Sequence, residues 1–120
     1  MTSSVEPNDR PAGWLRGVLE PCILALVSDD ESYGYELTVR LEAAGLGKVA
    51  GGSLYPALAR LEKQGLVTVE WRAGEGGPGR KFYAITPAGR ATLDEQAVRW
   101  DDFASAVGRL LNGATSAVPR

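Results

Sequence analysis

Few residues of this chain have side chains suited to catalysis or metal binding. Its 120 residues include no histidine and one cysteine, Cys22. These counts exclude an intrachain disulfide, a His- or Cys-based metal site and a His-dependent nucleophile. Acidic pairs at Asp94 and Glu95 and at Asp101 and Asp102 fall opposite the apolar stripe of a helical pattern, which indicates a solvated face. We expect no catalytic residue, no metal site and no cofactor, and Cys22 as a structural thiol rather than a redox sensor.

Two adjacent cations follow a glycine-rich segment and could bind phosphate. Arg80 and Lys81 come directly after residues 73–79, AGEGGPG. A hairpin with this tip can place cations along a DNA backbone or in a minor groove, although a solvated turn is the alternative interpretation. Since neighbours in a strand point to opposite faces, we expect only one of the two to face DNA well. Arg80 is favoured because it is nearer the tip, and Arg72 across the hairpin is a weaker candidate.

A second candidate site is the start of a predicted helix. Gly51, Gly52 and Ser53 let the backbone approach a ligand closely, and the unpaired amides of a helix start favour phosphate. Ser53 either contacts a phosphate or base, or only caps the helix. Tyr55 and Arg60 extend the polar surface, with packing as the alternative for Tyr55. Because few of these groups can form bidentate base contacts, DNA shape would contribute to sequence readout.

The charge distribution is compatible with DNA binding although the whole chain is acidic. The net charge is -2. Residues 37–90 carry eight basic and four acidic side chains, a net +4, whereas residues 1–36 carry -5 and residues 91–120 carry -1. The candidate DNA-binding groups fall mainly in the positive segment. A charge of this size predicts modest, salt-sensitive binding.

Three helices are predicted to position these groups. Apolar residues recur at helical spacing from Trp14 to Leu26, and Pro21 either kinks this helix or lies in the first turn of a new one. The second helix is predicted from an N-cap at Ser32 to a stop at Gly45. The third begins at residues 51–53 with Pro56 in its first turn, and Gly65 closes it.

The sequence after Gly65 predicts a hairpin and a long helix. Strands are expected at residues 67–71 and 80–85, and Thr86 followed by Pro87 is a strong helix start. The last helix should run to about residue 113. Its apolar stripe has coiled-coil spacing and comprises Leu93, Ala97, Trp100, Ala104, Val107 and Leu111, widened by Phe103 and Leu110. The predicted fold class is α+β: a winged helix-turn-helix domain plus a long C-terminal dimerisation helix.

The length fits one such domain. We expect a flexible arm at residues 1–12, the winged domain at 13–86, the dimerisation helix at 87–113 and a flexible tail at 114–120. No apolar run approaches the ~18 residues of a membrane span, and the first ten residues lack a signal-peptide core. A cytoplasmic protein is therefore expected.

The sequence resembles the PadR family of bacterial transcriptional regulators, in particular the short subfamily with one C-terminal helix. The resemblance is carried by LRGVLEPCILALV, SYGYEL, GGSLYPALARLEKQGLV, GRKFYAITPAG and the Trp-containing last helix. It implies a homodimeric repressor that binds a pseudo-palindromic operator in double-stranded DNA. The last helix would form the dimer interface with the first, through Leu15, Leu19, Leu93, Ala97, Val107 and Leu111.

The resemblance also implies roles for several aromatic residues. Tyr33 and Tyr35 would lie beside the DNA backbone, although packing of one of them against the third helix is equally compatible. Trp100 either fills the dimer core or, with its symmetry mate, sandwiches a planar aromatic ligand. By resemblance the ligand pore would be lined by Trp14, Gly17, Glu20, Pro21, Trp100, Phe103 and Ala104.

The pore departs from the multidrug-binding members of the family. Pro21 replaces an aliphatic residue and Trp14 is bulkier, so both could narrow or fill the space. The absence of histidine means that any ligand would be sensed by shape and stacking. Two alternatives remain: a dimeric small-molecule-binding protein whose role on DNA is weak or lost, and a winged-helix module that binds another protein.

Overall fold

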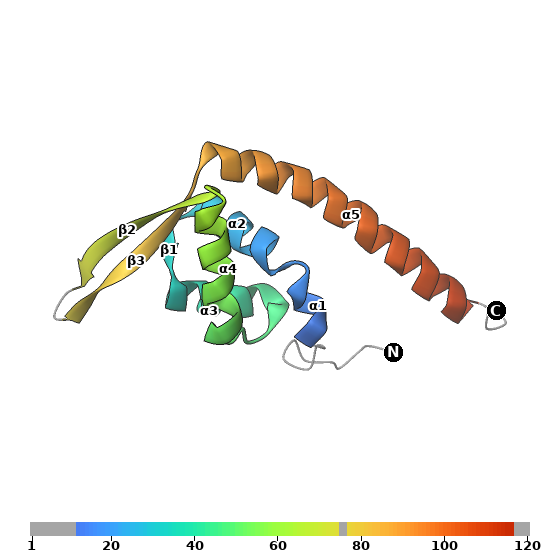
Figure 1. Cartoon of the computed structure of the whole chain (residues 1–120). Coiled ribbons are helices and arrows are strands. Elements are labelled where there is room, and N and C mark those ends of the chain that lie inside the picture. The colour runs from blue at the N-terminus through green and yellow to red at the C-terminus, as the bar shows by residue number, and fades with distance from the viewer. Residues whose placement is uncertain (1–11, 75–76, 117–120) are drawn as a thin grey trace.

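The computed structural model describes residues 12–74 and 77–116. Nearly all of the expected N-terminal arm lies outside these residues. So do residues 75–76 of the hairpin tip and 117–120 of the expected tail. Within the described part, four α-helices, one wider helical turn and a small sheet form a domain from which one long helix projects (Figure 1).

The first helical region consists of two helices rather than a kinked one. Helix α1 covers Ala12–Arg16 and α2 covers Leu19–Asp29. Pro21 is the third residue of α2, where an amide would have no intrahelical partner, so proline is tolerated. Of the two possibilities left open by the sequence, the structure selects a new helix with Pro21 in its first turn.

The second helix starts differently from the prediction. Ser32 and Tyr33 form a short strand, β1 (Ser32–Tyr33), and α3 (Gly34–Leu41) begins after it, with Tyr33 as N-cap. The predicted cap at Ser32 is therefore wrong: its buried hydroxyl donates instead to Glu36 Oε1 at 2.6 Å. The chain leaves α3 through one wider turn, η2 (Glu42–Leu46), where Gly45 adopts a φ of +96°. That left-handed conformation explains the predicted glycine stop.

The third helix agrees with its predicted bounds. Helix α4 covers Gly51–Lys63, and its buried face consists of Leu54, Ala57, Leu58 and Leu61. Pro56 is the sixth residue of α4, in the second turn rather than the first as expected. The carbonyl of Gly52 consequently lacks its usual amide partner four residues on, and the exposure of Gly52 lets water replace it.

The wing, which is the hairpin of β2 and β3, and the last helix come after the turn at Leu66. Strand β2 (Val67–Gly74) pairs antiparallel with β3 (Gly77–Ile85), and the sheet order is β1-β3-β2. Both strands extend further toward the tip than predicted. Helix α5 covers Pro87–Ser116, past the expected end at 113, and the Gly89 amide donates to Thr86 Oγ1 at 2.9 Å. The predicted Thr86 cap is confirmed.

The core lies among α2, α3, α4 and the base of the sheet. Ile23, Leu24, Leu37, Leu41 and Leu58 are completely buried there. Helix α5 packs against α2 near its start and then leaves the domain (Figure 1). The Cα radius of gyration is accordingly 17.1 Å, against about 14 Å for a compact domain of this length. No helix among residues 12–74 and 77–116 is long and apolar enough to cross a membrane.

The passage of α5 over the Leu66 turn requires glycine at position 89. A Cβ there would lie 2.1 Å from the Leu66 carbonyl oxygen and 2.7 Å from Ile85 Cγ1. We expect Gly89→Ala to lower the free energy of unfolding by about 1–3 kcal/mol, because backbone must move to relieve the overlap. Urea denaturation measures this change in the free energy of unfolding. Gly108→Ala in the same helix is the control, since its Cβ meets no atom within 4 Å; equal effects of the two variants would contradict this account.

Candidate nucleic-acid interface

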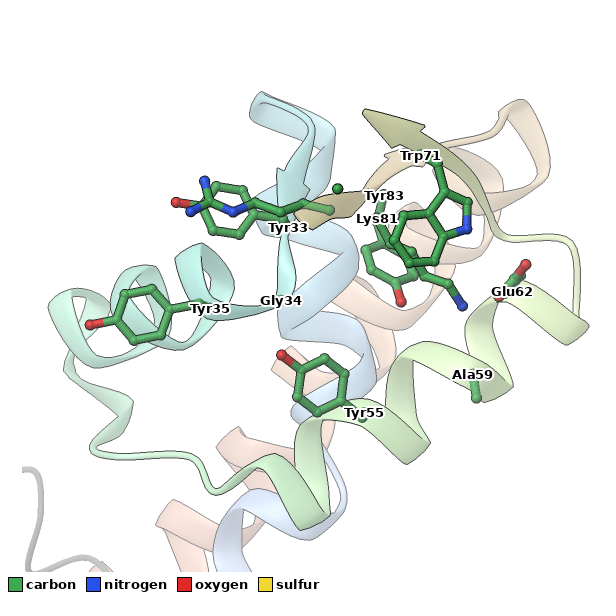
Figure 2. Close-up of a pocket in the computed structure, with 11 residues that line it drawn as sticks. Tyr33, Gly34, Tyr35, Tyr55, Ala59, Glu62, Trp71, Lys81 and Tyr83 are labelled. Atoms are coloured by element: carbon green, nitrogen blue, oxygen red, sulfur yellow. The ribbon is translucent and has the colours of Figure 1, made fainter. Parts of the chain in front are cut away.

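One hollow gathers most of the predicted DNA-binding groups. It has a volume of about 520 Å³ and opens between α3, α4 and the wing (Figure 2). Its lining comprises Tyr33, Gly34, Tyr35, Tyr55, Ala59, Glu62, Trp71, Gly79, Arg80, Lys81 and Tyr83. Residues from three parts of the sequence thus share one surface.

The start of α4 borders this surface and is open. Gly51, Gly52 and Ser53 are exposed, and the N-cap is Ala50, which makes no side-chain capping bond. Ser53 is therefore not the cap of this helix. The positive end of the helix dipole and its first amides remain available to an anion such as phosphate.

The three tyrosines differ in their surroundings. Tyr33 is half-buried, with its ring edge-on to Phe82 at a centroid distance of 5.3 Å. It packs on the wing and not on α4. Tyr35 is 69% exposed and Tyr55 52% exposed, so both hydroxyls can reach a ligand. The Tyr55 ring lies over Gly34, where a Cβ would come within 2.6 Å of it.

Both wing cations line the hollow, by different routes. The guanidinium of Arg80 lies 4.5 Å from the Tyr33 ring centroid, and the Lys81 ammonium lies 5.7 Å from the Trp71 ring. As neighbours in β3 they leave the strand on opposite faces. Because β1 pairs with β3 only at Tyr83 and Phe82, the outer part of that strand edge is unpaired and Arg80 reaches the hollow around it.

Two other arginines are engaged within the protomer. Arg72 pairs with Glu31 and, at 2.9 Å, with Glu70, and these carboxylates raise its pKa. Arg60 Nε donates to Glu20 Oε2 at 2.6 Å. The sequence had suggested Arg60 for DNA and Glu20 for a ligand pore; the structure joins them.

The residues expected at the dimer interface and pore lie partly in the core. Leu19 is only 6% exposed and belongs to the protomer core, with Leu15 and Leu93 packed against it. Ala104 and Pro21 are half-buried, whereas Ala97 and Gly17 are exposed. Further along α5 the apolar stripe is open, with Phe103 61% and Leu111 62% exposed.

The aromatic residues expected in the pore are also open to solvent. Trp14 is 69% exposed and Trp100 49% exposed. The ring centroids of Trp100 and Phe103 are 6.0 Å apart.

Cys22 and the acidic side chains of the described residues are the candidates for a second site. Cys22 is half-buried, and burial raises the pKa of its thiol, which disfavours the reactive thiolate. Within residues 12–74 and 77–116, no three His, Cys, Asp or Glu side chains gather as a metal ion would need.

Comparison with known proteins identifies the family. The family model of the PadR-like transcriptional regulators matches residues 23–95. The chain belongs to the PadR-like family. Among curated relatives, the transcriptional regulator Rv3488 of Mycobacterium tuberculosis is 41% identical over 85 residues, which cover 71% of this chain and 78% of that protein. The transcriptional regulator YqjI of Escherichia coli is 38% identical over 81 residues, 66% of this chain and 37% of that longer protein.

Solved structures of the family share the fold. A PadR-like regulator from Bacillus cereus superposes with a TM-score of 0.73 at 41% identity, covering 83% of this chain and 97% of that one. A PadR family regulator from Eggerthella lenta gives a TM-score of 0.74 at 35% identity, covering 82% and 86%. The winged helix-turn-helix fold with a long last helix is thus confirmed for this PadR-like chain.

Sequence reasoning missed six residues that line this hollow: Gly34, Ala59, Glu62, Trp71, Gly79 and Tyr83. Trp71 follows Val67 and Val69 in strand alternation, so its face could have been predicted. Its 66% exposure could not have been predicted, because the hydrophobic core lies under the base of β2 and does not extend as far as Trp71.

The contact between Tyr55 and Gly34 can be tested directly. In Gly34→Ala the new methyl group would overlap the Tyr55 ring, and we expect the ring to rotate away while the fold is kept, because a side-chain end moves more easily than backbone. NMR shifts of the Tyr55 ring protons measure this. Gly51→Ala is the matched control, since its Cβ would lie 3.5 Å from the same ring, an ordinary contact. Unchanged Tyr55 shifts in Gly34→Ala would contradict the packing.

Proposed function

We propose that this PadR-like regulator is a homodimeric repressor of transcription that a small planar ligand releases from DNA. The observation that carries the DNA-binding part is the joint surface of α4 and the wing. Tyr35, Tyr55 and the cations Arg80 and Lys81 line one hollow, and the exposed start of α4 lies next to the Tyr55 ring. A helix start fits the major groove while wing cations reach the adjacent backbone.

Dimerisation is supported by α5. A 30-residue helix that leaves its own domain exposes Trp100, Phe103, Val107, Leu110 and Leu111. Apolar residues at coiled-coil spacing favour pairing with a second helix, since a monomer would leave this stripe in water. A two-fold dimer would present two α4 helices to half-sites about 34–36 Å apart on a pseudo-palindrome.

The ligand would bind where the two α5 helices meet. Trp100 and Phe103 offer flat apolar faces there, and Trp14 adds a third aromatic side chain. Stacking of aromatic rings contributes roughly 0.5–1.5 kcal/mol beyond area burial. To shift the dimer from 1:99 to 99:1 in favour of a geometry that does not bind DNA, the ligand must bind that geometry more tightly by about 5.5 kcal/mol.

The DNA role is tested by selecting duplexes from a random pool. We expect a two-fold symmetric motif, and its affinity should fall steeply with salt because phosphate contacts release counterions. Retention of no duplex even at low salt would reject the proposal. Quenching of tryptophan fluorescence by planar aromatics would then favour a small-molecule-binding dimer.

Loss of a wing cation should weaken binding to every sequence. In Arg80→Ala we expect lower affinity for specific and random duplexes alike, with the log–log salt slope reduced by about one unit, because one phosphate contact is removed. Fluorescence anisotropy at several salt concentrations measures both. Arg99→Ala on α5, another exposed arginine, is the control and should leave the slope unchanged. An unaltered slope in Arg80→Ala would exclude Arg80 from the interface.

A charge in the apolar stripe should separate the protomers. We expect Val107→Asp to shift the protein from dimer to monomer, because a carboxylate buried between two helices loses its hydration without a partner. Sedimentation velocity measures the change. Val98→Asp makes the same substitution elsewhere on α5, outside the stripe, and should remain dimeric. Dimers of equal stability in both variants would move the interface away from this stripe.

A further inference from the structure

Trp71 is a large apolar residue that the wing holds in water. It is 66% exposed, although it lies in the hollow beside α4 and not at a chain end. In Figure 2 its indole stands on the wing, with Lys81 and Glu62 nearby. An exposed tryptophan within a candidate binding surface calls for a functional explanation more than scattered exposed leucines do.

The orientation of Trp71 follows from strand alternation. Val67, Val69 and Trp71 project from the same face of β2, and their side chains are buried, half-buried and exposed in that order. On β3 the same face carries Tyr83, which is 5% exposed, and then Lys81. This is the face that covers the core at the base of the wing, so further out Trp71 points toward the same side as α4.

Neighbouring groups hold the indole in place. Trp71 and Lys81 are register partners in the β2–β3 pair, and the ammonium lies 5.7 Å from the indole centroid. The indole also lies across Gly79: a Cβ at that position would be 3.4 Å from Trp71 Cε3. One side of the ring is thus supported by β3, while its other side and the indole N–H contact no partner among residues 12–74 and 77–116.

We infer that Trp71 and Lys81 together bind the sugar–phosphate backbone of a DNA duplex, with the indole against a deoxyribose and its N–H donating to a phosphate oxygen. This inference rests on the proposed DNA-binding function and adds a contact to it. Two observations select this occupant. Lys81 supplies positive charge beside the ring, and Arg80 adds a second cation to the lining of the same hollow. Tyr55 of α4 also lines the hollow, and its ring lies next to Gly51 at the exposed start of that helix. The carboxylate of Glu62 repels phosphate at the inner end, so the backbone lies toward the tip.

Substitution of Trp71 tests the contact with the full chain and a fluorescein-labelled random-sequence duplex at low salt. Trp71→Ala should weaken binding about tenfold, since a hydrogen bond and the apolar contact are both lost. Trp71→Phe keeps a ring but loses the N–H, and should fall between Trp71→Ala and the parent protein. Val98→Ala is the matched control: Val98 is 64% exposed on α5, outside the apolar stripe, and should bind as the parent does.

A second measurement separates direct contact from a structural role. Duplex should change the tryptophan emission of the parent protein, and most of that change should be absent in Trp71→Phe. In a double-mutant cycle, the loss for Trp71→Ala combined with Lys81→Ala should be smaller than the sum of the single losses, because the two side chains act on one backbone segment. Urea denaturation should show that Trp71→Ala unfolds as the parent does.

The outcomes distinguish this inference from the proposed function. If the parent protein binds duplex and Trp71→Ala binds equally well, DNA binding stands and the Trp71 contact is rejected. An emission change that survives in Trp71→Phe also rejects it. If the parent protein binds no duplex at all, both the proposed function and this inference are wrong.

Discussion

The junction between the wing and α5 is the constraint on which the rest of this structure depends. Thr86 accepts the Gly89 amide at 2.9 Å, and its hydroxyl donates to the Gly65 carbonyl at 2.7 Å. The Thr86 amide donates to the Leu66 carbonyl at 3.1 Å, and Gly89 lets the helix pass that carbonyl. One threonine therefore caps α5 and ties it to the turn between α4 and β2.

This junction relates the three functional elements to one another. Since α4 ends at the Gly65 turn, the wing starts there and α5 leaves from it, α5 is joined over a short path to both elements that we propose to face DNA. A second link holds α4 on the rest of the domain: Arg60 of α4 pairs with Glu20 in the first turn of α2. Arg60 is thus better placed to fix α4 on α2 than to contact a base, and the exposed Arg60 carries part of the positive charge of the surface.

Predictions from the sequence were most reliable where one physical signal decided them. The Thr86–Pro87 helix start, the Gly45 and Gly65 stops and the apolar faces of α2 and α4 follow from local capping and spacing, and the structure confirms them. Ser32 shows the limit of such signals. A serine before a helix looks like a cap, but here pairing of β1 with β3 places it in the sheet, and a two-residue strand leaves no alternation to detect.

The sequence by itself determined the order of the longer helices and the two wing strands, the winged-helix class and the exposed stripe of α5, because these depend on periodicity and capping within short windows. Only the tertiary structure decided which side chains meet. It placed Leu19 in the core. It joined Arg60 to Glu20 and Arg72 to Glu31. It also set Trp71 beside Lys81 on the part of the wing that extends beyond the core. Those pairings link residues up to 41 positions apart. They depend on how α4 packs on α2 and on how the hairpin folds back beside the turn after α2, which no local spacing specifies.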